Sequence, residues 1–104
     1  MERTGASREE ENRLVLDLVQ AMIGAISDTF RRVTIEVGKE RVLLRFLLER
    51  EDDIAREEID DIAFEFEALQ ERDLNTEVVV MVDARPMADL ALPGRVVFGR
   101  REAR

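Results

Sequence analysis

The chain has 104 residues, 45% of them apolar, and a net charge of −8, so we expect one domain, residues 1–104, with a modest core. It lacks His, Cys, Tyr and Trp, which removes the commonest general base, the thiol nucleophile and every zinc-thiolate site. No membrane-length apolar run and no secretory signal occur, and the acidic balance opposes nucleic-acid binding, so we expect a cytoplasmic protein.

A helix is predicted close to the N-terminus. Residues 1–8 are polar and are expected to fray, as are residues 101–104 at the other end. From Glu9 to Ile26 the apolar residues recur at helical spacing, and three glutamates occupy the first turn, where the helix dipole favours acids. The predicted buried stripe is Leu14, Val15, Leu18, Val19, Met22, Ile23 and Ile26.

Four strands are predicted after this helix. Residues 33–37 and 42–48 alternate apolar and polar positions around the turn Gly38–Glu40, which is typical of a hairpin, and the second strand is apolar enough to lie inside the sheet. Residues 75–84 contain a continuous β-branched run that suits a central strand. Residues 96–98 form a short last strand.

The segment from Glu51 to Glu71 carries nearly all of the net charge. It contains ten acidic residues and one basic residue, Arg56, for a net of −9, so the rest of the chain sums to +1. Asp52 and Asp53 are suitable N-caps for a helix that continues to about Arg72. A concentrated field of one sign indicates recognition of a partner more often than a folding device.

The acidic helix has two distinct faces. At 100° per residue, its apolar positions cluster toward the sheet at Ala55, Ile59, Ile62, Phe66 and Leu69. The opposite, partner-binding face is predicted to hold Asp53, Glu57, Asp60, Asp61, Phe64, Glu67 and Glu71. Like charges three and four residues apart cost the helix roughly 0.2–0.5 kcal/mol per close pair.

Phe64 falls among these carboxylates, and three explanations stay open. It can pack locally, either back over a neighbouring aliphatic stem or partly at an edge if the helix is rotated. It can be an apolar anchor inside a charged rim, as in protein-binding hot spots, or it can form a symmetric dimer contact.

The element order α-β-β-α-β-β predicts an α+β two-layer sandwich with two helices on one face of a four-stranded sheet. If the second and third strands are parallel, the acidic helix is their right-handed crossover. The order of the strands stays open.

No catalytic residue, metal site or cofactor is expected. Asp60 and Asp61 diverge by 100° on a helix, no calcium loop or phosphate loop occurs, and no Ser or Thr has a His partner. The loop of residues 85–94 carries Met87, Leu90 and Leu92, and it either folds back over the sandwich or adds a secondary partner-binding surface.

Two stretches resemble small bacterial immunity proteins of contact-dependent growth inhibition and colicin-type toxin systems. They run from Ala21 to Val37 and from Glu49 to Ile59, and the likeness covers about residues 14–70. The resemblance implies a non-catalytic inhibitor that binds a bacterial toxin, a basic nuclease, through the acidic helix face. It further implies that Phe64 fills an apolar pocket and that the surrounding acids pair with toxin Arg and Lys.

Two other classes stay open. The chain could be a homo-oligomeric structural or regulatory module, a homodimer for example, that uses a strand edge or the 85–94 loop. It could also be a small enzyme subunit or an adaptor. Salt dependence separates the first class from the inhibitor, because charge-steered association weakens with ionic strength and apolar self-association does not.

Overall fold

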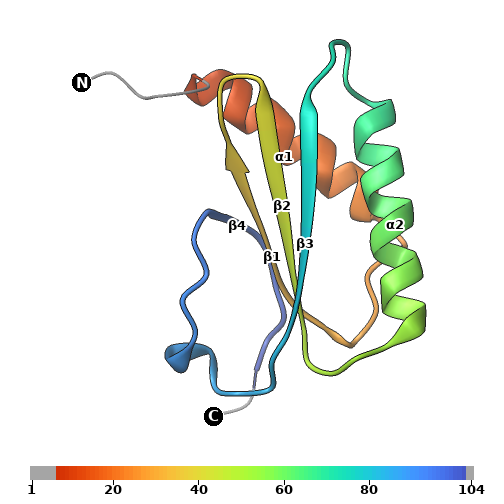
Figure 1. The fold of residues 1–104 in the computed structure, drawn as a ribbon, viewed down its shortest axis with the longest axis vertical. Helices are drawn as coiled ribbons and strands as arrows, with labels where there is room; N and C mark the ends of the chain where they lie inside the picture. Colours follow the sequence, from red (N-terminus) through yellow and green to blue (C-terminus); the bar gives the residue numbers. More distant parts are fainter. Residues whose placement is uncertain (1–6, 103–104) are drawn as a thin grey trace.

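In the computed structural model, which describes residues 7–102, the chain forms two helices and a four-stranded sheet (Figure 1). In chain order the elements are α1 (Arg8–Met22), β1 (Phe30–Val37), β2 (Arg41–Leu48), α2 (Asp53–Ala68), β3 (Asn75–Val82), the short 3-10 helix η1 (Met87–Asp89) and β4 (Arg95–Gly99). The predicted element order and the α+β class are confirmed.

α1 starts at a side-chain cap and ends earlier than its apolar pattern predicts. The Ser7 hydroxyl accepts a hydrogen bond from the backbone N–H of Glu10 at 3.1 Å, which satisfies one of the free donors of the first turn. The helix stops at Met22 and not at Ile26, because Gly24 adopts φ +81°, a conformation that ends helices and favours glycine.

Only part of the predicted stripe of α1 is buried. The buried residues of the helix are Leu14, Leu18, Ala21 and Met22. Val19 is 39% exposed and Ile23 is 76% exposed, so the prediction that both lie in the core is wrong. They share one side of the helix with Leu16, which is 67% exposed, because residues three, four and seven apart lie on one face.

The sheet has the order β3-β2-β1-β4. β1 and β2 form the predicted antiparallel hairpin, in which the Gly38 N–H donates to the Arg41 carbonyl oxygen at 2.8 Å, and β2 lies inside the sheet as predicted. β2 and β3 are parallel, as a crossover through α2 requires.

β3 is an edge strand, so the prediction of a central strand is wrong. A run of β-branched residues indicates apolar surroundings on both faces of a strand, but it carries no information on whether a neighbour pairs with each of its edges.

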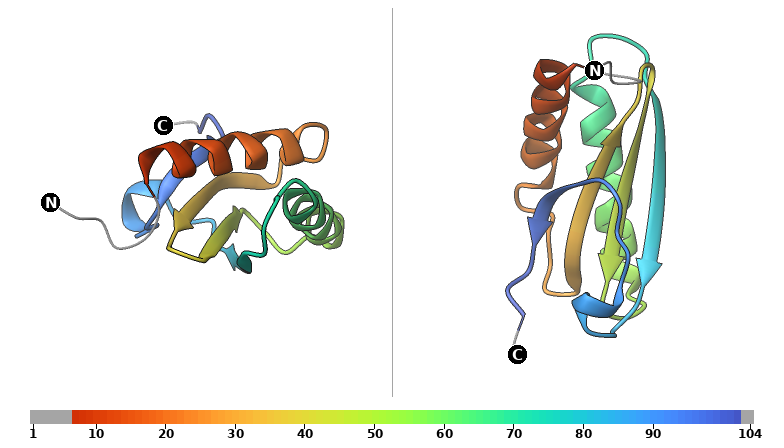
Figure 2. Two further views of the ribbon diagram at one scale, coloured as in Figure 1. Left: turned by 90° about the horizontal axis from the view of Figure 1, so that it is seen from above. Right: turned by 90° about the vertical axis from the view of Figure 1, so that its left-hand side faces the viewer.

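Both helices cover one face of the sheet, and the core lies between the two layers (Figure 2). α2 contributes Ala55, Ile59, Ile62 and Phe66 to the core, as predicted. The rings of Phe30 and Phe46 meet edge to face, with centroids 6.2 Å apart, an arrangement that adds about 0.5–1.5 kcal/mol beyond their burial.

α2 begins at the predicted cap. The Asp52 carboxylate accepts hydrogen bonds from the backbone N–H groups of Ile54 at 3.0 Å and Ala55 at 3.3 Å, and from the Thr29 hydroxyl at 2.8 Å. These bonds, that of Thr29 above all, lower the pKa of Asp52. The helix ends at Ala68, with Leu69 as its C-cap, and does not reach the predicted end near Arg72.

The connection between β3 and β4 lies against the sheet face that the helices leave open (Figure 2). The Arg45 guanidinium, on that face of β2, donates to the Pro93 carbonyl oxygen at 2.9 Å. Gly94, with φ +101°, lies so close to β1 that a Cβ would come within 2.9 Å of the Ile35 carbonyl oxygen. The connection therefore folds back over the sandwich, one of the two arrangements expected for residues 85–94.

An ion pair between the buried Arg31 and the half-buried Glu102 fastens the end of the described chain to β1. Arg31 is 3% exposed and donates from Nε and Nη2 to the two carboxylate oxygens of Glu102 at 2.8 and 2.6 Å, and from Nη1 to the Asp83 carbonyl oxygen at 2.7 Å. The hydrogen-bonded guanidinium lowers the pKa of Glu102 to about 2.

Fraying was expected over residues 1–8 and 101–104. Ser7 and Arg8 instead form the cap and the first residue of α1, and Glu102 is held by Arg31. Residues 1–6 and 103–104 lie outside the described residues.

Candidate interaction surface on the second helix

The outward side of α2 presents the predicted acidic face. All seven predicted residues are exposed: Asp53, Glu57, Asp60, Asp61, Phe64, Glu67 and Glu71. Six of them lie on α2 itself, on the side opposite the buried residues that face the sheet. Glu71 lies beyond the helix end, in the connection to β3.

The charges of this face are not neutralised within the described residues 7–102. The one basic residue of α2, Arg56, donates to Glu51 at 2.7 and 2.9 Å, next to the start of the helix. That bond raises the pKa of Arg56 and lowers that of Glu51. By contrast, Glu57, Asp60, Asp61 and Glu67 have no salt-bridge partner in this part of the chain, so their field extends into solvent.

Two large apolar side chains are exposed on the same helix. Phe64 is 76% exposed and Ile54 is 66% exposed. This exposure contradicts the explanation in which Phe64 packs back onto its own helix. The two residues are ten positions apart, about 15 Å along the axis at 1.5 Å per residue, with Glu57 and Asp61 between them. The face therefore combines apolar contact area with unpaired carboxylates.

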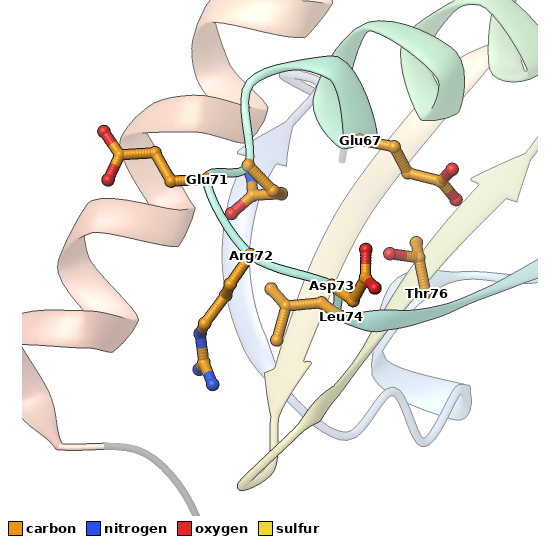
Figure 3. Close-up of a pocket in the computed structure, with 7 residues that line it drawn as sticks. Glu67, Glu71, Arg72, Asp73, Leu74 and Thr76 are labelled. Carbon is orange, nitrogen blue, oxygen red and sulfur yellow. The ribbon is translucent and has the colours of Figure 1, made fainter.

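A cleft of about 430 Å³ lies where α2 ends and β3 begins (Figure 3). Its lining residues are Glu67, Gln70, Glu71, Arg72, Asp73, Leu74 and Thr76. The hydroxyl of Thr76 is turned toward the Asp73 carboxylate and the Glu67 carboxylate lies on the other side of Thr76, whereas Arg72 points away and pairs with Glu10 of α1 (Figure 3). The cleft thus extends the acidic face to the first residues of β3.

Two buried acceptors in the cleft are unsatisfied. Thr76 Oγ1 and Gln70 Oε1 have no hydrogen-bond partner, although the Gln70 amide nitrogen donates to Asp17 at 3.1 Å and to the Phe66 carbonyl oxygen at 3.0 Å.

The described residues contain no cluster of three or more acidic side chains arranged to hold a metal ion. The cleft is lined by the carboxylates of Glu67, Glu71 and Asp73, and carboxylates accept hydrogen bonds from ammonium and guanidinium groups.

Met87, Leu90 and Leu92 are not brought to this surface. They are half-buried in the connection between β3 and β4, which lies on the far side of the sheet from α2 (Figure 1).

The sequence reasoning missed Ile54, Asp73 and Thr76. Ile54 stands at the margin of the apolar arc of α2, where burial depends on the exact rotation of the helix. Asp73 and Thr76 join the surface only because α2 stops at Ala68 and the chain turns back, a boundary that periodicity predicts poorly.

Comparison with known proteins gives the chain a family. The sequence model of the MafI2 immunity protein family matches residues 11–102, so the chain belongs to this family. It is accordingly a non-catalytic immunity protein with a cognate toxin as its partner. No curated protein matches the chain significantly. Among the described residues, no helix is long and apolar enough to cross a membrane.

Proposed function

We propose that this MafI2-family protein acts as a single domain and neutralises its cognate toxin by covering a basic surface of the toxin with the outward face of α2. The proposed toxin is a nuclease, whose phosphate-binding cleft must be lined with Arg or Lys. An acidic face that occupies such a cleft excludes the nucleic acid without any chemistry of its own.

One observation supports this proposal above the others, namely the position of Phe64. Its ring is 76% exposed and is surrounded by carboxylates that have no partner in the described chain. An apolar anchor inside a charged rim is the usual anatomy of an energetic hot spot. The charges speed association with a basic partner, and Phe64, once it is buried in the complex, slows dissociation.

The proposal is tested by rescue of growth. The C-terminal region of the protein encoded immediately upstream is expressed with and without this chain, and we expect that region alone to arrest growth and co-expression to restore it. If the region is harmless, or if it stays toxic when this chain is present, the inhibitor proposal is wrong.

The face is then tested by variants. Phe64→Ala should weaken toxin binding by about 30-fold, mainly through faster dissociation, because it removes the anchor. Asp60→Lys should weaken it by about tenfold, mainly through slower association, and this loss should shrink at high salt. Glu40→Lys makes the same change of charge at the exposed hairpin turn and serves as the matched control. If Phe64→Ala and Asp60→Lys both bind like Glu40→Lys, α2 is not the binding face.

A homodimer is the competing account, and it makes the opposite prediction. It requires self-association in the absence of toxin, at a strength that does not fall with salt.

A further inference from the structure

Among residues 7–102, no strand pairs with the outer edge of β3. The N–H of Asn75 donates to the Glu40 carbonyl oxygen at 3.0 Å, and that of Asp83 donates to the Leu48 carbonyl oxygen at 2.9 Å. Since a strand alternates with period two and the register is continuous, every odd-numbered residue from 75 to 83 bonds to β2. The N–H and C=O groups of Thr76, Val78, Val80 and Val82 therefore point away from the sheet.

This edge carries few of the features by which proteins prevent strand addition, since its one charged residue, Glu77, is paired with Arg41 of β2 at 3.0 Å. β3 is eight residues long, apolar over most of its length and free of Pro, Lys and bulges, and Val78 and Val82 are 40% and 41% exposed. The opposite edge is different, since β4 has five residues, a register shift against β1 and an arginine at its end. An exposed sheet edge is the place where an extended segment of another chain can add as a further strand.

The surroundings of this edge select a basic occupant. The acidic cleft lies at the start of β3, where Thr76 is both a cleft residue and the first residue with an outward-pointing backbone. Glu67 and Asp73 lie on either side of Thr76 there (Figure 3). A strand that pairs with β3 would therefore end beside the carboxylates of Glu67 and Asp73.

We propose that β3 accepts a strand of the toxin as a fifth strand of the sheet, and that an Arg or Lys of that strand enters the cleft formed by Glu67, Asp73 and Thr76. This inference rests on the proposed function, because the added strand belongs to the same toxin that contacts α2. It extends the contact from the helix face to the edge of the sheet.

Charge argues against a second copy of this chain as the occupant. Two β3 strands paired about a twofold axis would bring two segments of net charge −9, residues 51–71 of each copy, to the two sides of that axis. A basic strand gains from the same field that two acidic copies would have to overcome.

Hydrogen exchange of single backbone amides tests this proposal, with the upstream-encoded C-terminal region as the probe. In the free chain the amides of Val78 and Val80 should exchange rapidly, and those of Glu77 and Val79, which bond to β2, should exchange slowly. In the complex the exchange of Val78 and Val80 should slow by about 100-fold, because their N–H groups then bond to the added strand.

A proline variant gives a second readout. Val78→Pro removes an outward N–H and no hydrogen bond to β2, and Val78→Ala is its matched control because it removes the side chain but keeps the amide. We expect Val78→Pro to bind the toxin region at least about tenfold more weakly than Val78→Ala does.

The outcomes separate the two proposals. If a complex forms and is weakened by Asp60→Lys, but the edge amides stay fast and the two Val78 variants bind alike, strand addition is wrong and the α2 proposal stands. If the free chain protects these amides in a concentration-dependent way, a second copy occupies the edge and our assignment is wrong. If no complex forms at all, both proposals fail.

Discussion

The bond between Arg31 and Glu102 allows a sharp prediction about stability, which is tested by Glu102→Gln. The substitution keeps the shape of the side chain but removes the charge that neutralises a guanidinium only 3% exposed. Removing one partner of a fully buried ion pair costs about 3–5 kcal/mol, and the 24% exposure of the Glu102 side chain places this pair below that range. Since the amide oxygen can still accept one hydrogen bond and the Asp83 carbonyl oxygen still accepts another, we expect a loss of about 2–3 kcal/mol in the free energy of unfolding.

Urea and thermal denaturation, followed by far-ultraviolet circular dichroism, measure this loss. For a domain of this size, 1 kcal/mol corresponds to about 4–8 °C in Tm, so the midpoint should fall by roughly 10 °C or more. Glu49→Gln is the control, because Glu49 pairs with Arg100 at 2.8 Å and both side chains, 43% and 29% exposed, are more accessible than Arg31; pairs closer to solvent contribute less, down to about 1 kcal/mol or under at the surface. Equal losses in the two variants would refute the conclusion that the pair of Arg31 and Glu102 anchors the end of the chain.

Three further predictions concern the free protein. Glu102 has a pKa lowered from 4.5 to about 2, so on acidification the unfolded state binds the proton of this group before the folded state does. The stability that Glu102 contributes is complete above about pH 4.5 and should be lost as the pH falls toward 2. Denaturation at several pH values should therefore show a shallower loss of stability for Glu102→Gln than for the unchanged chain. Leu18→Ala should cost about 2–5 kcal/mol of unfolding free energy, because Leu18 is fully buried. Leu16→Ala, at a position 67% exposed, should cost under about 1 kcal/mol. Similar costs for the two variants would contradict the assigned rotation of α1. Glu57→Lys should stabilise the chain by about 0.5–1 kcal/mol, because it turns the repulsion of Glu57 by Asp53, Asp60 and Asp61 into attraction. If this stabilisation does not shrink in 1 M NaCl, the electrostatic cause is wrong.

The features predicted correctly from the sequence are those that depend on local patterns. The cap at Asp52, the inward face of α2 and the hairpin at Gly38 each depend on a few neighbouring residues, and each is confirmed. The exposure of Phe64 was also predictable, since the helical period alone places it opposite Ile62 and Phe66.

The features that were missed depend on contacts between distant segments. The edge position of β3 is set by β1 pairing with β4 on one side and with β2 on the other, and no pattern inside residues 75–84 records that choice. The pair of Arg31 and Glu102 joins residues 71 positions apart, so a sequence pattern shows only two ordinary charged residues. The exposure of Ile23 follows from the glycine turn at Gly24, which ends α1 early.

Two departures from ordinary folding rules lie next to each other in this structure. A helix selected for stability alone would interleave basic residues among its acids, and α2 has only Arg56, which is bonded to Glu51. An edge strand selected for solubility alone would carry a lysine, a proline or a bulge, and β3 has none. Local rules are broken most often where a protein binds or reacts, and the cleft at Glu67 and Thr76 joins these two departures into one surface. A partner that is basic and offers a strand would relieve both at once, whereas a partner that met only the helix would leave the apolar edge of β3 open.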